Sequence, residues 1–453
     1  MSEWLTSVGL DVGTTSTQLI VSQLKVENTS SGFTVPEMVI AERNIRYKSP
    51  VHFTPLKGQD LVDGEGIRQI VEREYARAGI RREDVDTGAV IITGETSRKE
   101  NAKVVLEALS DFAGDFVVAT AGPDLESVLA AKGAGAVEYS LDTGKPVLHM
   151  DIGGGTANLA LIEDGKITAT TCLNVGGRLL KLDADGCVRY VSPVLEGLTQ
   201  LQVGDVATDS QLQQVAQVLV QALEMAAGLR EATELLEKLT TKETYGEWLP
   251  PNGDVVLSFS GGVADCIEVE KEPLEFGDIG PVLGQAIKKS RLCEKEYRLG
   301  SETIRATVIG AGCHSAQLSG STVFYKNIGF PMKNLPVVRL EQQDVSARRI
   351  REALGRLDAH GVLAIPGLAA PDYGTVKAMA REIAEGFGGK TVLVAVEKDM
   401  AKALGQAVAL QLPENTGCLC IDSVKVADGS FLDVGAPVGP AMPVVVKTLV
   451  MER

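Results

Sequence analysis

The stretch VGLDVGTTSTQLIV, residues 8–21, decides the fold of this chain. It reads as an apolar strand, a turn rich in glycine and threonine, and a second apolar strand. Asp11 ends the first strand, and the turn contains Gly13, Thr14 and Thr15. Glycine lets backbone N–H groups approach an anion closely, and a carboxylate beside an anion is useful when a cation is also bound. Alone, the pattern is more often an ordinary hairpin.

The pattern returns in LHMDIGGGTANLALI, residues 148–162, where the strand ends at Asp151. The second turn has the corresponding small residues: Gly153, Gly154, Gly155 and Thr156. Two copies of one unit indicate duplicated halves that face each other across a phosphate. A third stretch, VVLSFSGGV at 255–263, ends in Gly261 and Gly262, where a backbone can lie flat against a base or ribose.

These three motifs, in this order, resemble the ATPase superfamily of actin, sugar kinases and seventy-kilodalton heat-shock chaperones. Residues 121–136 (AGPDLESVLAAKGAGA) and 308–316 (VIGAGCHSA) resemble its first and second connecting helices. The resemblance covers residues 8 to about 320. It implies an α/β fold with two actin-like lobes, each a ribonuclease H-like mixed sheet with helices.

The order of the motifs predicts three parts. They are a first lobe at 1–148 with an inserted subdomain at about 22–92, a second lobe with the returning connecting helix at 149–329, and a C-terminal domain at 330–453. In the last part strands alternate with helices, which predicts an α/β domain with its own sheet. We expect this domain to bind a partner, because the heat-shock lid and the actin pattern offer no counterpart.

Local signals add three expectations within these parts. Asp209 and Asp344 are expected to cap the helices that follow them. The dipeptide Asp428-Gly429 is a strong turn signal and predicts a hairpin between residues 418–426 and 430–434. Asp265 is expected to cap the turn after the third motif, with contact to a ribose as the alternative.

Composition excludes several classes of protein. The net charge of −16 over 453 residues argues against nucleic acid or an anionic membrane as the main partner. No stretch approaches 18 uninterrupted apolar residues, and the first residues do not read as a signal peptide. Seven scattered cysteines fit reduced thiols in a cytosol, and the spacing Cys418-x-Cys420 is expected in a core.

ATP chemistry requires Mg²⁺ on the phosphates, donors around them and an oriented nucleophile. Asp11 and Asp151 are the candidate metal ligands and catalytic carboxylates. The phosphates would be held by three threonines and three glycine N–H groups: Thr14, Thr15, Thr156, Gly13, Gly154 and Gly155. In the superfamily a carboxylate near the first connecting helix helps to place water. The motif does not choose here between Asp124 and Glu126, and Glu126 is carried forward.

One departure from the superfamily pattern limits the chemistry that the cleft is expected to perform. The heat-shock pattern has Glu before the proline of the connecting helix, and here that position is Gly122, which puts rapid hydrolysis in doubt. His149 lies two residues from Asp151 on the same strand and therefore on the same face. We expect it to be a hydrogen-bonded core histidine and not a catalytic one. Arg98 and Lys99 are expected to be a solvated pair.

Beyond the shared motifs, the chain is similar to the family of ethanolamine ammonia-lyase reactivating factors, the ethanolamine utilization protein EutA. The distinguishing stretches are TGETSRKENA at 93–102 and VADGSFLDVGAPVGPAMPVVVKTLVM at 426–451. The resemblance implies a chaperone-like ATPase that, with ATP and Mg²⁺, exchanges damaged cobalamin on the lyase for adenosylcobalamin. It also implies a bacterial cytoplasm and a link to the ethanolamine microcompartment.

Two other functions remain open on the sequence. A small-molecule kinase of the sugar or carboxylate type would use the same cleft, and an actin-like filament would share the fold. The sequence leaves open whether the chain forms a homo-oligomer.

Overall fold

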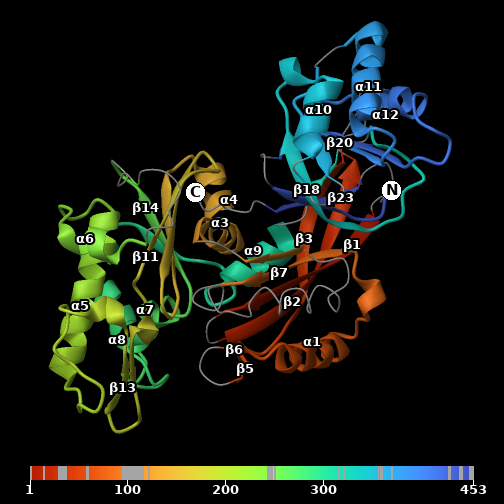
Figure 1. Ribbon diagram of the computed structural model, residues 1–453. Coiled ribbons are helices and arrows are strands. Elements are labelled where there is room, and N and C mark those ends of the chain that lie inside the picture. The colour runs from red at the N-terminus through yellow and green to blue at the C-terminus, as the bar shows by residue number, and fades with distance from the viewer. Residues whose placement is uncertain are drawn as a thin grey trace.

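The structure is a computed structural model, shown in Figure 1. It describes residues 3–13, 16–28, 38–57, 61–93, 117–120, 123–241, 248, 251, 253–314, 317–319, 322–355, 357, 361–368, 371–426, 430–437 and 442–447. Three large sheets organise these residues, and two helices lie between the first and second sheets (Figure 1).

The first sheet has the order β3-β2-β1-β7-β8, with β4 on β2. Its strands are β1 (Glu3–Val12), β2 (Ser16–Asn28), β3 (Met38–Lys48), β4 (His52–Phe53), β7 (Thr87–Ile92) and β8 (Val117–Thr120). Because strand side chains alternate, Val8, Leu10 and Val12 point to one face, where they form a core with helix α1 (Gly64–Ala78). Asp11 therefore points to the opposite face.

The second sheet repeats this design, with the order β11-β10-β9-β14-β15. Its strands are β9 (Val147–Ile152), β10 (Ala157–Glu163), β11 (Lys166–Leu173), β14 (Val256–Ser260) and β15 (Tyr297–Leu299). Strand β1 is antiparallel to β2 and parallel to β7, and in the same way β9 is antiparallel to β10 and parallel to β14. The duplication inferred from the two hairpins is confirmed, and the fold is the expected mixed α/β type.

The outer face of the second sheet is covered by its own elements. They are β12 (Leu180–Leu182), β13 (Val188–Val191), α5 (Asp209–Ala226), α6 (Glu234–Leu239), α7 (Asp265–Glu268) and α8 (Gly280–Lys288). Apolar side chains of α5 and α8 join those of β9 and β14 in one core. Met225 of α5 is buried, as expected for a packing residue.

Helices α3 (Pro123–Gly133) and α9 (Ala306–His314) join the two sheets, and α4 (Ala136–Thr143) follows α3. The backbones of α3 and α9 touch at two glycines. A Cβ atom on Gly133 would lie 1.8 Å from the carbonyl oxygen of Ala306, and one on Gly310 would lie 2.0 Å from that of Leu129. Only glycine permits this crossing, because any side chain would push the helices apart.

The third sheet has the order β16-β23-β22-β18-β19-β20-β21-β17. Its strands are β16 (Gln317–Leu318), β17 (Phe324–Lys326), β18 (Met332–Arg339), β19 (Val362–Ile365), β20 (Val392–Val396), β21 (Cys418–Ile421), β22 (Phe431–Val434) and β23 (Pro443–Lys447). Helices α10 (Ala347–Leu354), α11 (Tyr373–Phe387) and α12 (Ala401–Ala409) share one apolar core on a single face, in which Cys418 and Cys420 are buried.

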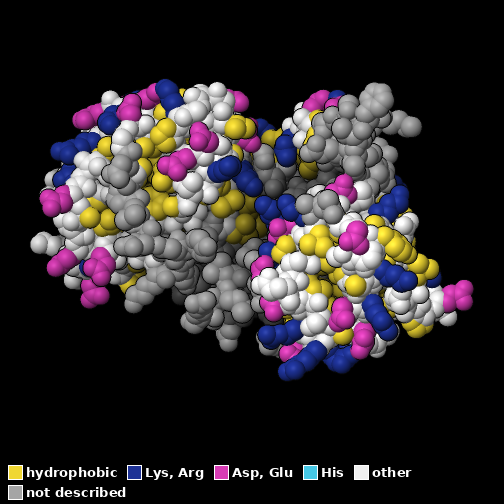
Figure 2. All heavy atoms as spheres, turned by 90° about the horizontal axis from the view of Figure 1, so that it is seen from above, with side chains coloured by type: hydrophobic (Ala, Val, Ile, Leu, Met, Phe, Trp, Pro, Cys, Tyr) yellow, Lys and Arg dark blue, Asp and Glu magenta, His cyan; other side chains and the backbone are white. Residues whose placement is uncertain are grey.

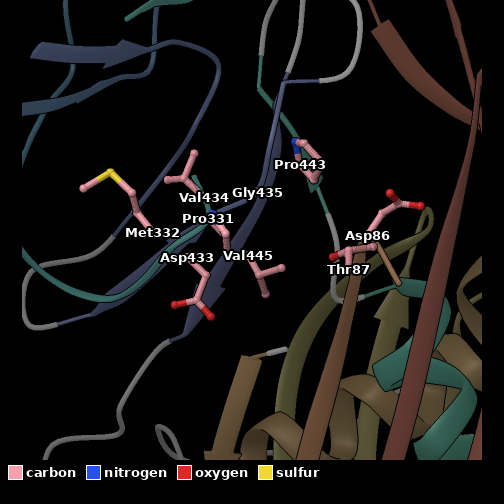
Figure 3. Close-up of a pocket in the computed structure, with 9 residues that line it drawn as sticks. All are labelled: Asp86, Thr87, Pro331, Met332, Asp433, Val434, Gly435, Pro443 and Val445. Atoms are coloured by element: carbon pink, nitrogen blue, oxygen red, sulfur yellow. The ribbon is translucent and has the colours of Figure 1, made fainter. Parts of the chain in front are cut away.

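The third sheet also contacts the first lobe. Val445 of β23 packs with Ala89, Ile91 and Ala311. Near this contact, Asp86 at the approach to β7 and residues of β18, β22 and β23 line a cavity of about 10 Å³ (Figure 3). Such a volume has room for about one water molecule and not for a nucleotide.

Several local expectations are wrong. Strands β21 and β22 do not pair with each other, because β21 lies between β20 and β17 while β22 lies between β18 and β23. Thr208 and Ser346 are the N-cap residues of α5 and α10, not Asp209 and Asp344.

The range of about 22–92, expected as an inserted subdomain, mostly belongs to the first sheet. Strands β2, β3, β4 and β7 all pair within the first sheet. Two parts of the range are not in that sheet: the two-stranded sheet of β5 (Leu56–Lys57) and β6 (Leu61–Val62), and helix α1. Arg98 and Lys99 lie outside the described residues.

Among the described helices, none combines the length and the apolar character that crossing a membrane requires. Figure 2 shows two large parts of the molecule, and on the visible face of each part basic and acidic side chains are intermixed.

Candidate functional site

Asp11 and Asp151 occupy equivalent positions near the ends of β1 and β9. Asp11 is paired across the strands with Gln18 of β2, and Asp151 is paired with Asn158 of β10. Both carboxylates point away from the outer cores, toward the side of each sheet that receives α3 and α9. The duplicated hairpins therefore bring the two predicted metal ligands toward one shared cleft.

Asp151 is held by two hydroxyl groups and is only 6% exposed. Ser260, at the end of β14, donates a hydrogen bond to Oδ1, and Thr307 of α9 donates to Oδ2 at 3.4 Å. Burial raises the pKa of Asp151 from 3.8 to about 6, although both hydroxyls act in the opposite direction. The carboxylate is oriented, and a positive ligand would stabilise its ionised form.

Asp11 is half-buried and accepts a hydrogen bond from Thr93 Oγ1 at 2.9 Å. Its pKa is raised to about 7, mainly because the surrounding residues exclude water. The charge of Asp151 raises it further, so the two carboxylates are close enough to repel each other. Paired carboxylates of this kind are typical of a cation site.

The glycines of the two turns divide into structural and accessible ones. Gly13 donates its N–H to Ser16 O at 2.9 Å, and Gly153 donates to Thr156 O at 2.9 Å. The expectation that the Gly13 N–H holds a phosphate is therefore wrong, because that hydrogen closes the turn. Gly155 has no heavy atom within 4 Å of an added Cβ, so its backbone faces open space.

Of the three threonines assigned to the phosphates, one is described. Thr156 follows Gly155 and is half-buried beside the accessible backbone. Thr14 and Thr15 lie outside the described residues.

Gly261 and Gly262 also serve different purposes. Gly261 has φ of +88°, and a Cβ atom there would lie 2.3 Å from the carbonyl oxygen of Ile152. It fixes the end of β14 against β9, and its N–H donates to Thr303 O at 3.0 Å. At Gly262 an added Cβ meets only Ile304 Cδ1 at 4.0 Å, so this is the glycine against which a ligand can lie.

Arg178 is a residue of the site that the sequence patterns did not identify. The turn before it packs on the second hairpin, because Gly176 leaves no room for a Cβ against Gly154 O at 2.3 Å. Arg178 N donates to Gly154 O at 2.7 Å, and its side chain lies over Gly154. Its guanidinium Nε is 3.2 Å from Asp278 Oδ2. The positively charged guanidinium is thus held beside the hairpin by a carboxylate 100 residues further along the chain.

His149 is a core histidine, as expected. It is 0% exposed, with Nδ1 3.0 Å from Ser258 Oγ and Nε2 2.9 Å from Ser260 Oγ. Burial lowers its pKa to about 3, so the imidazole is neutral. The alternation Ser258-x-Ser260 on β14, in register with His149 and Asp151, was a readable signal of this arrangement.

The remaining carboxylates singled out in the sequence are Glu126, Asp124 and Asp265. Glu126 is half-buried near the start of α3, and the side chain of Asp124 lies outside the described atoms. Asp265 does not cap α7, whose N-cap is Ala264, and it accepts a hydrogen bond from Thr303. Thr303 also accepts from Gly261, so Asp265 supports the third motif.

The donor set fits Mg²⁺. Two aspartates and the buried side-chain oxygens Gln18 Oε1 and Asn158 Oδ1, which have no hydrogen-bond partner, are all hard oxygen ligands. Within the described part of the chain, no group of three or more His, Cys, Asp or Glu residues is placed to hold a metal. Mg²⁺ typically takes one or two carboxylates and completes its shell with phosphate and water, so two suffice.

A separate groove of about 750 Å³ lies between α5, α8 and residues 270–273. Its lining includes Gln213, Gln217, Glu224 and Lys289, and none of the motif residues. It is therefore distinct from the site of the two aspartates.

Comparisons with known proteins identify similar chains. Two proteins named ethanolamine ammonia-lyase reactivase EutA match: that of Salmonella typhimurium is 39% identical and that of Escherichia coli 38% identical, each over 98% of both chains. The model of the family described as "Ethanolamine utilisation protein EutA" matches residues 3–452. The crystal structure of a Ppx/GppA family member from Aquifex aeolicus covers 68% of this chain and 97% of its own, with 15% identity and a TM-score of 0.43.

Proposed function

This chain belongs to the ethanolamine utilisation protein EutA family, and on that premise we propose that it reactivates ethanolamine ammonia-lyase. The observation that carries the proposal is 39% identity over 98% of the chain to a protein named as this reactivase. The kinase alternative is not favoured, since both named relatives are reactivases.

The reactivation uses ATP and Mg²⁺ bound in the cleft between the first two sheets. Asp11 and Asp151 hold the cation, which when bound neutralises the phosphate oxygens. Gly155 and Thr156 approach the phosphates, and Gly262 lies against the nucleoside. Glu126 orients the attacking water. Hydrolysis is slow, in keeping with Gly122 before the proline of α3.

Nucleotide binding is coupled to the lyase by movement of the two lobes. The crossing of α3 and α9 at Gly133 and Gly310 is the joint between them. A ligand changes the population of lobe arrangements only by preferring one of them, so the nucleotide and the lyase are coupled when each of them prefers one arrangement over the other. The energy of ATP then drives exchange of the damaged cobalamin for adenosylcobalamin, while the corrinoid stays on the lyase.

We assign the lyase contact to the C-terminal domain, within a division of the chain at 1–148, 149–329 and 330–453. Helix α10 has two exposed arginines, Arg349 and Arg348, the second of which pairs with Glu352 on the same helix. Removing residues 331–453 is not a clean test of this assignment. Such a deletion takes Val445 out of a core shared with Ala89 of the first lobe and leaves β16 and β17 without partner strands.

The protein works in the bacterial cytoplasm beside the ethanolamine microcompartment, with the lyase as its partner. Neither nucleic acid nor a membrane is required for the reaction, and a homo-oligomer is compatible with it.

A reactivation assay tests the proposal. Ethanolamine ammonia-lyase carrying cyanocobalamin is mixed with the full chain, free adenosylcobalamin and Mg²⁺, with and without ATP. We expect deaminase activity to return only with ATP. Tight nucleotide binding without any recovery would contradict the reactivase function while leaving the nucleotide site intact.

A further inference from the structure

We propose that the side-chain amides of Gln18 and Asn158 belong to the cation site, so that the site is built from two aspartate–carboxamide pairs. This inference rests on the proposed Mg²⁺–nucleotide site and adds two positioning residues to it.

The two amides occupy equivalent places in the duplicated sheets. Gln18 is directly opposite Asp11 in the antiparallel pair β1–β2, and Asn158 is directly opposite Asp151 in β9–β10. Directly opposite residues point to the same face, with their Cβ atoms about 4.5–5.5 Å apart. Each aspartate therefore has a carboxamide as its immediate neighbour on the cleft side of the sheet.

Both amides carry an unsatisfied acceptor. Gln18 is 3% exposed and Asn158 is 1% exposed, yet Oε1 of the first and Oδ1 of the second have no hydrogen-bond partner. A buried polar atom without a partner costs about 1–3 kcal/mol, and native proteins contain few of them. The same cost at the same place in both halves indicates that a ligand satisfies these atoms.

The orientation of Gln18 is fixed by its other end. Its Nε2 donates to the carbonyl oxygen of Ile304 at 3.1 Å, and a carbonyl can only accept. The free end is therefore the oxygen, an acceptor. Ile304 belongs to the segment that supports Gly261 and Gly262, so Gln18 also links the first lobe to the third motif.

A hydrated divalent cation is the ligand that fits these acceptors. Mg²⁺ keeps several of its waters, and each water has hydrogens to donate. An amide oxygen beside a ligating carboxylate can accept one of them.

The test measures cation affinity directly, with Mn²⁺ as the probe and the full-length chain at saturating ADP. Electron paramagnetic resonance counts free Mn²⁺, so the readout does not depend on reactivation. We expect Asn158→Leu, which removes the acceptor at similar volume, to weaken Mn²⁺ binding about tenfold. Asn158→Asp adds a charge next to the cation and should tighten it about tenfold. Gln18→Met should weaken binding as Asn158→Leu does.

Two matched variants control for charge and for buried polar deletion. Asn44→Asp adds the same charge at an exposed position of β3. Asn44 is paired with Gln23 of β2, which lies five residues after Gln18 on that strand. Tyr75→Phe removes another buried atom without a partner, on the α1 side of the sheet. Neither should change the affinity for Mn²⁺. A purely structural role of Asn158 predicts that Asn158→Asp weakens binding, in the direction opposite to ours.

The outcomes separate this inference from the function on which it rests. If the wild-type protein shows no ADP-dependent Mn²⁺ binding, the proposed nucleotide function fails and the inference fails with it. If Asp11→Asn abolishes binding but the Asn158 and Gln18 variants bind Mn²⁺ like wild type, the function stands and the inference alone is overturned. Thermal melting curves confirm that each variant is folded.

Discussion

Ser260 donates its hydroxyl hydrogen to Oδ1 of Asp151, and the hydroxyl oxygen of Ser260 lies 2.9 Å from Nε2 of His149. Because the single hydrogen of Ser260 goes to the carboxylate, His149 must donate from Nε2, and its Nδ1 accepts from Ser258. The chain Ser258–His149–Ser260–Asp151 thus has one direction, and it orients the carboxylate of the second hairpin.

Removing the last link of this chain should weaken the cation site. In Ser260→Ala, Asp151 loses a hydrogen bond that lowers its pKa, so protons compete better with the cation. We expect Mg²⁺ affinity at pH 7, measured by calorimetry in the presence of ADP, to fall about tenfold, which corresponds to about 1.4 kcal/mol. Ser258→Ala is the control, since Ser258 touches His149 and not Asp151. Equal losses of Mg²⁺ affinity in both variants would contradict this direction of the hydrogen-bond chain.

Asp11→Asn should stabilise the cation-free protein at high pH. A carboxyl whose pKa is raised on folding favours the folded state at low pH, and this contribution is lost as the pH rises from 3.8 to about 7. Asparagine removes the titration, so at pH 8 in EDTA we expect the free energy of unfolding to exceed that of wild type by about 2–4 kcal/mol. Urea titrations at pH 4 and pH 8 measure this difference.

The same variant should be stabilised by ligand much less than wild type is. Addition of Mg²⁺ and ADP should raise the unfolding midpoint of wild type and leave that of Asp11→Asn nearly unchanged. If Asp11→Asn is less stable than wild type at pH 8 without cation, the ionised carboxylate of Asp11 does not destabilise the folded protein.

The two adjacent glycines of the third motif should separate folding from binding. Gly261→Ala places a Cβ 2.3 Å from Ile152 O at φ of +88°, so we expect a loss of stability of about 3 kcal/mol or more. Gly262→Ala meets only Ile304 Cδ1 at 4.0 Å and should fold normally, with reduced nucleotide affinity because its methyl group lies in the cleft. Chemical denaturation and a fluorescent nucleotide titration measure the two effects. Normal nucleotide affinity in Gly262→Ala would remove that residue from the site.

Gly310→Val should disrupt the joint between the lobes. Its Cβ would lie 2.0 Å from Leu129 O, so α3 and α9 must separate. We expect a loss of about 3 kcal/mol or more in unfolding free energy, with a lower midpoint in thermal denaturation. Gly329→Ala, at an exposed position with no neighbour within 4 Å, should change stability by less than about 0.5 kcal/mol.

Charge reversal on α10 tests the assignment of the lyase contact. Arg348→Glu with Arg349→Glu changes two exposed side chains and should leave nucleotide binding intact while weakening lyase binding in a pull-down assay. Reversal of Lys166 and Lys295, on the second lobe, is the matched control. Unchanged lyase binding in the α10 variant would move the contact to another surface.

Sequence alone determined the two hairpins, their aspartates and the duplication, because these features are local. Strand alternation and turn composition act within about 15 residues, and each copy repeats the same short pattern. The alternation of strands and helices in the C-terminal part was likewise predicted, since helical periodicity and apolar runs are local signals too.

Only the tertiary structure decided which residues meet at the site. Arg178 finds Asp278, and Asp151 finds Ser260 and Thr307, across 100 residues or more. The Asp428 turn signal failed for the same reason: β21 lies in the third sheet between the buried strand β20 and the edge strand β17, and it does not pair with the strand next in sequence. Local patterns fix which groups are present, but pairing, burial and charge between distant segments decide which of them act together.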